Sequence, residues 1–149
     1  MRSSGIQNIL ERLLLHHESE VVEFKEAKTG FDFGKIGRYF SALSNEANLQ
    51  GRDCAWLVFG VQDKRHVVVG SQFRSARKDL DSLKGEIAAR TTNRITFVEI
   101  HEVHLPQGRV VLFQIPPAPK GIPIAWDGHY YGRDGEELSP LNLEEIERI

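Results

Sequence analysis

Three acidic residues in this chain could together bind a divalent cation: Glu18, Glu23 and Asp63. Glu23 projects from a predicted strand over 21–25, Glu18 comes just before it, and Asp63 follows a second, apolar strand, where α/β proteins often place functional groups. Neighbouring carboxylates repel one another and would be stabilised by Mg²⁺ or Mn²⁺, which can activate water and neutralise a phosphodiester transition state. The alternative is that Glu18 is only solvated and that Asp63 shapes a tight turn before Lys64 and Arg65.

Basic residues are unevenly distributed, although the net charge is only −2. Residues 64–94 carry eight basic and three acidic side chains, whereas residues 127–149 carry two basic and seven acidic ones. Such an asymmetry can direct a polyanion to one face, or it can mark a solvated helix surface. The side chains that we expect to contact nucleic-acid phosphate are Lys64, Arg65, Arg74, Arg77 and Lys78, with Lys25 and Arg133 as further candidates.

Aromatic residues near the C-terminal end offer a further contact for nucleic acid. Trp126, Tyr130 and Tyr131 lie close to Arg133 in sequence and could stack on bases while the arginine holds phosphate. Cross-strand packing of the same aromatic residues within a hairpin explains them equally well. The chain has no Gly-x-x-x-x-Gly-Lys-Ser/Thr pattern, so nucleotide hydrolysis within it is unsupported.

The periodicity of apolar residues predicts the elements that position these side chains. Helical spacing predicts amphipathic helices over 5–16, 34–48 and 74–90, and Asn142 with Glu145 forms a capping-box start to a C-terminal helix. In the first strand Val22 and Phe24 should face one side, and Glu23 and Lys25 the other. Further strands are predicted over 54–62, 66–70, 95–103 and 109–115, and a hairpin over 126–133.

These elements predict a mixed α/β (α+β) fold. We expect a mixed sheet of about six strands, two main helices packed on it, and short N- and C-terminal helices. The chain has 149 residues with 40% apolar and 27% charged residues, a composition typical of one globular domain over 1–149. Because the last helix ends after about two turns, we expect the domain to be the N-terminal part of a longer protein.

The cysteine content and hydropathy indicate a cytoplasmic protein. Cys54 is the only cysteine, so no internal disulfide can form and a reducing compartment is expected. We expect its thiol to be buried and inert. No stretch approaches the roughly 20 apolar residues that span a bilayer, so no membrane association is expected.

Four short blocks, in this order, resemble the Schlafen AlbA domain. Residues 18–25 resemble its opening E-x-x-x-x-E-F-K signature, and residues 41–45, Ser-Ala-Leu-Ser-Asn, resemble its S-A-L/F-A/S-N helix. Residues 57–63, Leu-Val-Phe-Gly-Val-Gln-Asp, followed by Val69-Gly70, resemble L-V-F-G-V-x-D and V-x-G. Residues 130–135 resemble the closing Y-Y-x-R-x-G. Each block is short, but their order over residues 18–135 is specific.

The resemblance implies a module associated with nucleic acids. In bacteria and archaea the family is described as DNA-binding, often beside a divergent ATPase-like or winged-helix segment. In Schlafen proteins the related fold forms a metal-dependent endoribonuclease that acts on structured RNA such as tRNA, with two glutamates and one aspartate that align with Glu18, Glu23 and Asp63. This chain departs from the family in a longer, more polar segment over 46–53 where a short Gly-rich turn is usual.

Three functions therefore follow as predictions. The first is a DNA- or RNA-binding domain of the kind found in transcriptional regulators, and the second is a Mg²⁺- or Mn²⁺-dependent endoribonuclease. The third is a protein-interaction module of a larger ATPase-like protein. Because the Schlafen nuclease uses two such lobes, a homodimer of this single domain would be the expected way to complete a cleft.

Overall fold

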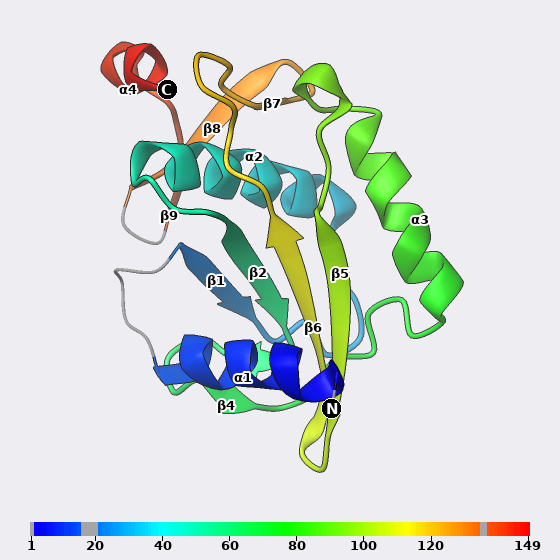
Figure 1. Cartoon of the computed structure of the whole chain (residues 1–149). Helices are drawn as coiled ribbons and strands as arrows, with labels where there is room; N and C mark the ends of the chain where they lie inside the picture. The colour runs from blue at the N-terminus through cyan, green and yellow to red at the C-terminus, as the bar shows by residue number, and fades with distance from the viewer. Residues whose placement is uncertain (1, 16–20, 135–136) are drawn as a thin grey trace.

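A four-stranded mixed sheet forms the centre of the protein, as the computed structural model shows (Figure 1). The structure describes residues 2–15, 21–134 and 137–149. The strand order is β1-β2-β6-β5, in which β1 runs parallel to β2 and the other neighbours are antiparallel. The strands are β1 (Val22–Lys25), β2 (Ala55–Phe59), β5 (Glu99–Leu105) and β6 (Gly108–Ile115).

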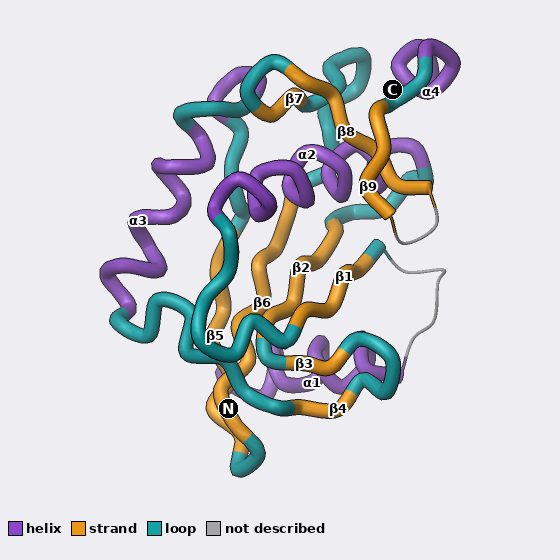
Figure 2. The backbone as a smooth tube through the Cα atoms, turned by 180° about the vertical axis from the view of Figure 1, so that it is seen from behind, coloured by secondary structure: helices purple, strands orange, loops and turns teal. Residues whose placement is uncertain are grey.

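Helices cover both faces of this sheet (Figures 1 and 2). One face packs against α1 (Arg2–Leu15) together with the hairpin of β3 (Val61–Gln62) and β4 (Val67–Val68). The other face packs against α2 (Phe33–Leu49) and α3 (Arg77–Ala88), and a short 3-10 turn, η1 (Thr92–Arg94), follows α3. Two hydrophobic cores therefore lie on opposite sides of one sheet.

The side-chain alternation of the strands matches the sequence prediction. Val22 and Phe24 pack in the core under α1, whereas Glu23 and Lys25 face the α2 side, where they form an ion pair. Every residue of β2 is buried, which confirms it as a strand covered on both faces.

A second, smaller sheet packs on the side of α2 that faces away from the central sheet. It contains β7 (Ala125–Trp126), β8 (His129–Asp134) and β9 (Glu137–Pro140). Gly37 allows this close approach, because a Cβ atom at that position would lie only 2.0 Å from the Trp126 ring. Helix α4 (Leu143–Arg148) follows, with the predicted Asn142–Glu145 capping box.

Polar side chains of α2 fasten the small sheet and the proline-rich segment to the helix. Asn45 donates to the carbonyl oxygens of Ile124 and Tyr131, and its own oxygen accepts from the Ile124 amide. Ser41 bonds the same two residues, donating to the Ile124 carbonyl and accepting from the Tyr131 amide. Ser44 donates to the Pro116 carbonyl. The polar residues of the Ser-Ala-Leu-Ser-Asn block therefore have a structural role, and we call Ser41, Ser44 and Asn45 the α2 clamp.

The mixed α/β class is confirmed, and the grouping of the strands differs from the prediction. Only four strands form the central sheet, and the rest form the hairpin β3–β4 and the β7–β9 sheet. Gly60 causes the first break: its positive φ of 96° turns the chain, and its amide donates to the Lys25 and Glu26 carbonyls. The sequence prediction did not include β9, because Glu137–Pro140 is mostly polar and ends in proline. Within the described residues, no helix is long and apolar enough to cross a membrane.

Candidate functional site

Glu23 lies buried beside the edge strand of the central sheet, with two cations next to its carboxylate. Its side chain is only 3% exposed. Lys25 Nζ lies 3.4 Å from Oε2, and Arg133 Nη2 lies 3.2 Å from Oε1. Lys25 comes from the same face of β1, whereas Arg133 comes from β8, which the α2 clamp holds in place. A buried carboxylate needs such partners, because burial of an unpaired charge is costly.

Tyr39 of α2 orients Lys25. The ammonium lies 5.2 Å from the centre of the buried Tyr39 ring, close enough for Tyr39 to affect its pKa. Burial lowers the pKa of Lys25, but Tyr39 and the charge of Glu23 outweigh burial and leave the pKa raised. Lys25 is therefore firmly protonated. The sequence did not reveal this role, because Tyr39 fits the apolar stripe of its helix.

One acceptor and one donor in this cluster have no hydrogen-bond partner in the described part of the chain. They are Oε1 of Glu23 and Nε of Arg133, both shielded from solvent. The contact between Glu23 Oε1 and Arg133 Nη2 is short enough for an ion pair, but its geometry is not that of a hydrogen bond. Buried polar atoms are nearly always bonded, so these two mark a place where a ligand or water could bind.

Asp63 lies within electrostatic range of Glu23. It occupies the turn that follows β3, which contacts β1. Burial raises the pKa of Glu23; the charges of Arg133 and Lys25 offset part of this increase, and the charge of Asp63 adds to it. Ionising Glu23 therefore costs more free energy in the folded protein than in the unfolded chain. The contribution of Glu23 to the free energy of unfolding is fully present below its unfolded pKa and is lost as the pH rises through its folded pKa.

Removing the Asp63 charge should make Glu23 easier to ionise. In the Asp63→Asn variant we expect the pKa of Glu23 to fall, because the like charge that raises it is gone. The measurement is a ¹³C NMR titration of the Glu23 carboxyl carbon in the wild type and the variant. Asp53→Asn serves as the matched control. An unchanged Glu23 midpoint in Asp63→Asn would show that the two carboxylates do not interact.

The third predicted acid, Glu18, lies outside the described residues. Within residues 2–15, 21–134 and 137–149, no group of three or more His, Cys, Asp or Glu side chains could hold a metal ion. In the structure Glu23 and Asp63 are close enough for their charges to interact. The metal site of Glu18, Glu23 and Asp63 stays a prediction.

The turn that carries Asp63 also presents Lys64 and Arg65 to solvent. Both residues are exposed, and neither side chain has a hydrogen-bond or ion-pair partner among the residues that the structure describes. They follow Asp63 directly, so they lie at the β1 edge of the sheet. We call the group Glu23, Lys25, Asp63, Lys64, Arg65 and Arg133 the β1-edge cluster.

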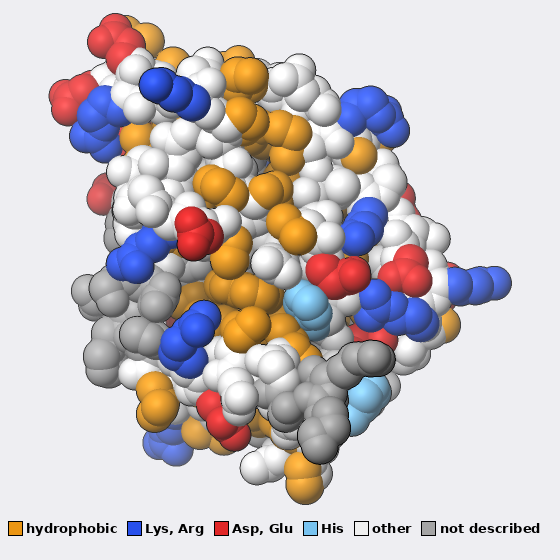
Figure 3. All heavy atoms as spheres, in the orientation of Figure 1, with side chains coloured by type: hydrophobic (Ala, Val, Ile, Leu, Met, Phe, Trp, Pro, Cys, Tyr) orange, Lys and Arg blue, Asp and Glu red, His pale blue; other side chains and the backbone are white. Residues whose placement is uncertain are grey.

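The basic residues at α3 lie at the opposite edge of the sheet, beside β5 (Figure 1). Arg74 makes a two-pronged ion pair with Glu86 at 2.8 Å. Arg77 lies 2.9 Å from Asp81 and 3.2 Å from Glu102. Figure 3 shows basic and acidic side chains intermixed over this region rather than a basic patch. Lys78 alone of the predicted α3 cations is exposed without a partner in the described structure.

The aromatic residues of the C-terminal hairpin are mostly structural. Trp126 is 3% exposed and packs against Gly37, and Tyr131 is partly buried against the main core. Only Tyr130 is exposed. Cys54 is half-buried and not fully buried as predicted, and this burial raises the pKa of its thiol, which disfavours the reactive thiolate.

Comparison with known proteins identifies the family. The model of the family described as Schlafen, AlbA_2 matches residues 18–142. The chain belongs to the Schlafen AlbA_2 family. No curated protein matches it by sequence.

Two solved structures have a similar fold. The crystal structure of the DIP2311 protein from Corynebacterium diphtheriae is 16% identical, with a TM-score of 0.63; the match covers 94% of this chain but only 27% of that one. The NMR structure of the N-terminal domain of a RecG-related protein from Nitrosomonas europaea is 21% identical, with a TM-score of 0.56, and covers 91% of this chain and 90% of that one. At these identities the likeness concerns the fold.

The Schlafen AlbA_2 blocks meet at the β1-edge cluster. The first supplies Glu23 and Lys25, the third supplies Asp63, and the last supplies Arg133. The helix block holds β8 on α2 and thereby fixes Arg133 beside Glu23. Residues that are far apart in sequence are thus gathered at one sheet edge.

Proposed function

We propose that this domain binds nucleic acid through phosphate contacts at the β1-edge cluster. The cluster holds four basic side chains and two acidic ones, in a chain whose net charge is −2. The family and the neighbouring domain from a protein described as related to the DNA helicase RecG support a role with nucleic acid. The observation that supports the proposal most is that Lys64 and Arg65 are exposed, have no partner among the described residues, and directly follow Asp63, whose charge acts on the buried Glu23.

The exposed cations, Lys64 and Arg65, and the partly buried ones, Lys25 and Arg133, would contribute differently to binding. Lys64 and Arg65 can reach phosphate without breaking an ion pair to any residue that the structure describes, and release of counterions would then favour binding. Within the described part of the chain, Arg133 has a buried N–H without an acceptor, which a phosphate oxygen could satisfy. Arg74 and Arg77 would have to break ion pairs first, so we place them outside the site.

Charge reversal of the turn tests this function. We expect Lys64→Glu with Arg65→Glu to weaken binding at least about tenfold at low salt, since two phosphate contacts become repulsive. The control, Lys78→Glu with Lys120→Glu, makes the same charge change at exposed positions elsewhere and should alter affinity less than about threefold. Fluorescence anisotropy with labelled tRNA, single-stranded DNA and duplex DNA measures both. Equal loss in the two variants, or no binding by the wild type to any probe, would refute the proposal.

Metal-dependent cleavage of RNA is the second candidate function. It is favoured by the buried oxygen of Glu23, which has no hydrogen-bond donor among the described residues, and by the nearby charge of Asp63. Carboxylate oxygens are the ligands that Mg²⁺ and Mn²⁺ prefer, so Glu23 and Asp63 fit as two members of a ligand set. Such an ion, when bound, would stabilise charge on a phosphodiester. Lys25 and Arg133 would then hold the substrate phosphate beside the carboxylates.

Cleavage of labelled tRNA with Mn²⁺ tests this second candidate. We expect product with Mn²⁺ and none with EDTA, and we expect Asp63→Asn to slow cleavage at least about 100-fold, as for the loss of a metal ligand. Lys78→Glu should leave the rate unchanged. If Asp63→Asn cleaves at the wild-type rate, or the wild type does not cleave, the domain is not this nuclease. Binding would remain measurable in either case.

A further inference from the structure

The two buried atoms of the β1-edge cluster that lack hydrogen bonds among the described residues need different partners. Oε1 of Glu23 is an acceptor, whereas Nε of Arg133 carries a donor hydrogen. Glu23 is 3% exposed and the Arg133 side chain 11%. Oε1 lies 3.2 Å from Nη2 of the same arginine, so the two unsatisfied atoms are neighbours. A ligand that satisfies both must offer a donor and an acceptor side by side.

A phosphate group satisfies only one of these atoms. Its oxygen can accept from Nε of Arg133, but an ionised phosphate has no hydrogen to donate to Oε1 of Glu23. Its negative charge would also lie close to the Glu23 carboxylate, and like charges repel. A neutral hydroxyl next to the phosphate would donate to Oε1 while the phosphate oxygen accepts from Nε. The cluster therefore fits a hydroxyl and a phosphate together better than a phosphate alone.

RNA carries such a hydroxyl beside every phosphate that joins two nucleotides. The ribose 2′-hydroxyl is both a donor and an acceptor, and it neighbours the phosphate on the 3′ side of the same sugar. DNA has the same phosphate but no 2′-hydroxyl. A deoxyribose would therefore leave Oε1 of Glu23 without a donor, and a buried acceptor without a donor weakens binding.

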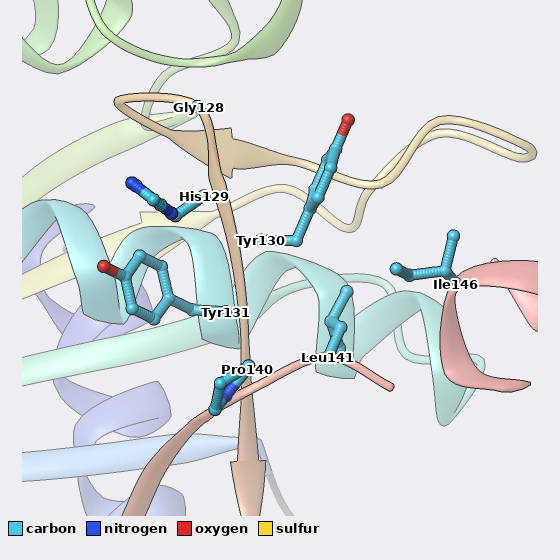
Figure 4. A pocket seen from close by; sticks show the side chains of 7 residues that line it. All are labelled: Gly128, His129, Tyr130, Tyr131, Pro140, Leu141 and Ile146. Atoms are coloured by element: carbon cyan, nitrogen blue, oxygen red, sulfur yellow. The ribbon is translucent and has the colours of Figure 1, made fainter. Parts of the chain in front are cut away.

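The exposed aromatic residue of β8 does not share a face with Arg133. Successive side chains of a strand point to opposite faces, so Tyr131 lies on the Arg133 face of β8 and Tyr130 on the other. Figure 4 shows the Tyr130 and Tyr131 rings on opposite sides of the strand. Of the two, Tyr130 is the exposed one. A nucleotide at Arg133 would therefore meet the cluster through its sugar and phosphate, without stacking its base on Tyr130.

We propose that the β1-edge cluster selects RNA over DNA through the sugar, an inference that rests on the proposed nucleic-acid site. A ribose 2′-hydroxyl donates to Oε1 of Glu23, and the neighbouring phosphate oxygen accepts from Nε of Arg133. Both protein atoms are shielded from solvent, so a side chain that covers them has to move. Lys25 is 26% exposed, more than Glu23 or Arg133, and its ammonium would turn from the carboxylate to the phosphate.

The affinity of the wild type for one short single-stranded sequence in three forms tests the proposal. The forms are RNA, 2′-fluoro RNA and DNA, and fluorescence anisotropy in EDTA measures binding without metal-dependent cleavage. The 2′-fluoro group cannot donate a hydrogen bond, so this probe isolates the donor. We expect RNA to bind at least about fivefold more tightly than either other form, because each of them leaves a buried acceptor unsatisfied. All three have the same bases, so a base amino group that donates to Oε1 would not separate them.

Two variants locate the selectivity. Glu23→Ala removes the acceptor, so the ratio of the RNA affinity to the 2′-fluoro affinity should fall to about one. The ratio is the readout, because this variant also removes a negative charge and changes the affinity for every probe. Lys64→Glu with Arg65→Glu should weaken the binding of both probes and keep their ratio. Circular dichroism checks that Glu23→Ala is folded, and the wild-type comparison of probes needs no variant.

The failure of this inference and that of the proposed function give different results. Equal affinity of the wild type for RNA and 2′-fluoro RNA would overturn the sugar selectivity and leave the nucleic-acid site in place. A ratio that a folded Glu23→Ala leaves unchanged would also overturn it, because the selectivity would then come from other residues. No binding of any probe would refute the proposed function itself.

Discussion

Replacing Arg133 by alanine is expected to destabilise the protein by about 3 kcal/mol at neutral pH, because a buried carboxylate loses one of its two cations. Glu23 is 3% exposed, so water cannot easily replace the guanidinium. Lys25 remains 3.4 Å from the carboxylate and limits the loss. Urea unfolding of the wild type and the variant at pH 7 measures the difference in the free energy of unfolding.

The loss in Arg133→Ala should shrink as the pH falls. The guanidinium lowers the pKa of Glu23, so its removal raises that pKa further. Once Glu23 is protonated, no unpaired charge remains, and the penalty for the missing arginine disappears. Glu23→Gln combined with Arg133→Ala should likewise cost less than the sum of the two single changes. An equal destabilisation at pH 7 and pH 4.5 would contradict a buried ion pair at this position.

Replacing Asn45 by alanine is expected to destabilise the fold by about 3 kcal/mol, because the change leaves buried backbone groups without partners. The Asn45 side chain makes bonds of 3.0 and 2.9 Å to the Ile124 and Tyr131 carbonyls, and it accepts one of 2.7 Å from the Ile124 amide. Loosening of β8 would also move Arg133. We therefore expect nucleic-acid affinity to fall together with stability.

The control for Asn45→Ala is Asn48→Ala, one turn further along the same helix. Asn48 is partly exposed and makes its one short bond, of 2.7 Å, to the Ala118 carbonyl. Its loss should cost about 1 kcal/mol, since water can replace it. Thermal or urea unfolding compares the two variants. Equal effects would show that the Asn45 clamp does not hold the small sheet.

Local patterns predicted most of the elements. The alternation in β1 placed Glu23 and Lys25 together, and the i, i+3, i+4 spacing predicted α2 and α3. The division into three sheets was not predictable in this way, because it depends on a turn at Gly60 and on packing around α2. Those contacts join residues that are distant in the chain.

The site was predictable only in part for the same reason. Lys25 and Glu23 are two residues apart, whereas Arg133 lies on a different sheet and reaches Glu23 only through the fold. The sequence shows one partner of Arg77, Asp81 at i+4, but not the second, Glu102, which is 25 residues later and also pairs with it. The count of basic residues therefore overestimated how many side chains at α3 are available to bind phosphate.

The most direct test of the β1-edge cluster is to map where nucleic acid touches the protein. The measurement is a ¹⁵N NMR titration of the 16.9 kDa domain with a short RNA hairpin and with a single-stranded DNA oligonucleotide. We expect the largest shift changes at residues 22–28, 61–66 and 131–134, and small changes along α3 and α4. Changes centred on α3, with none at these three segments, would contradict it.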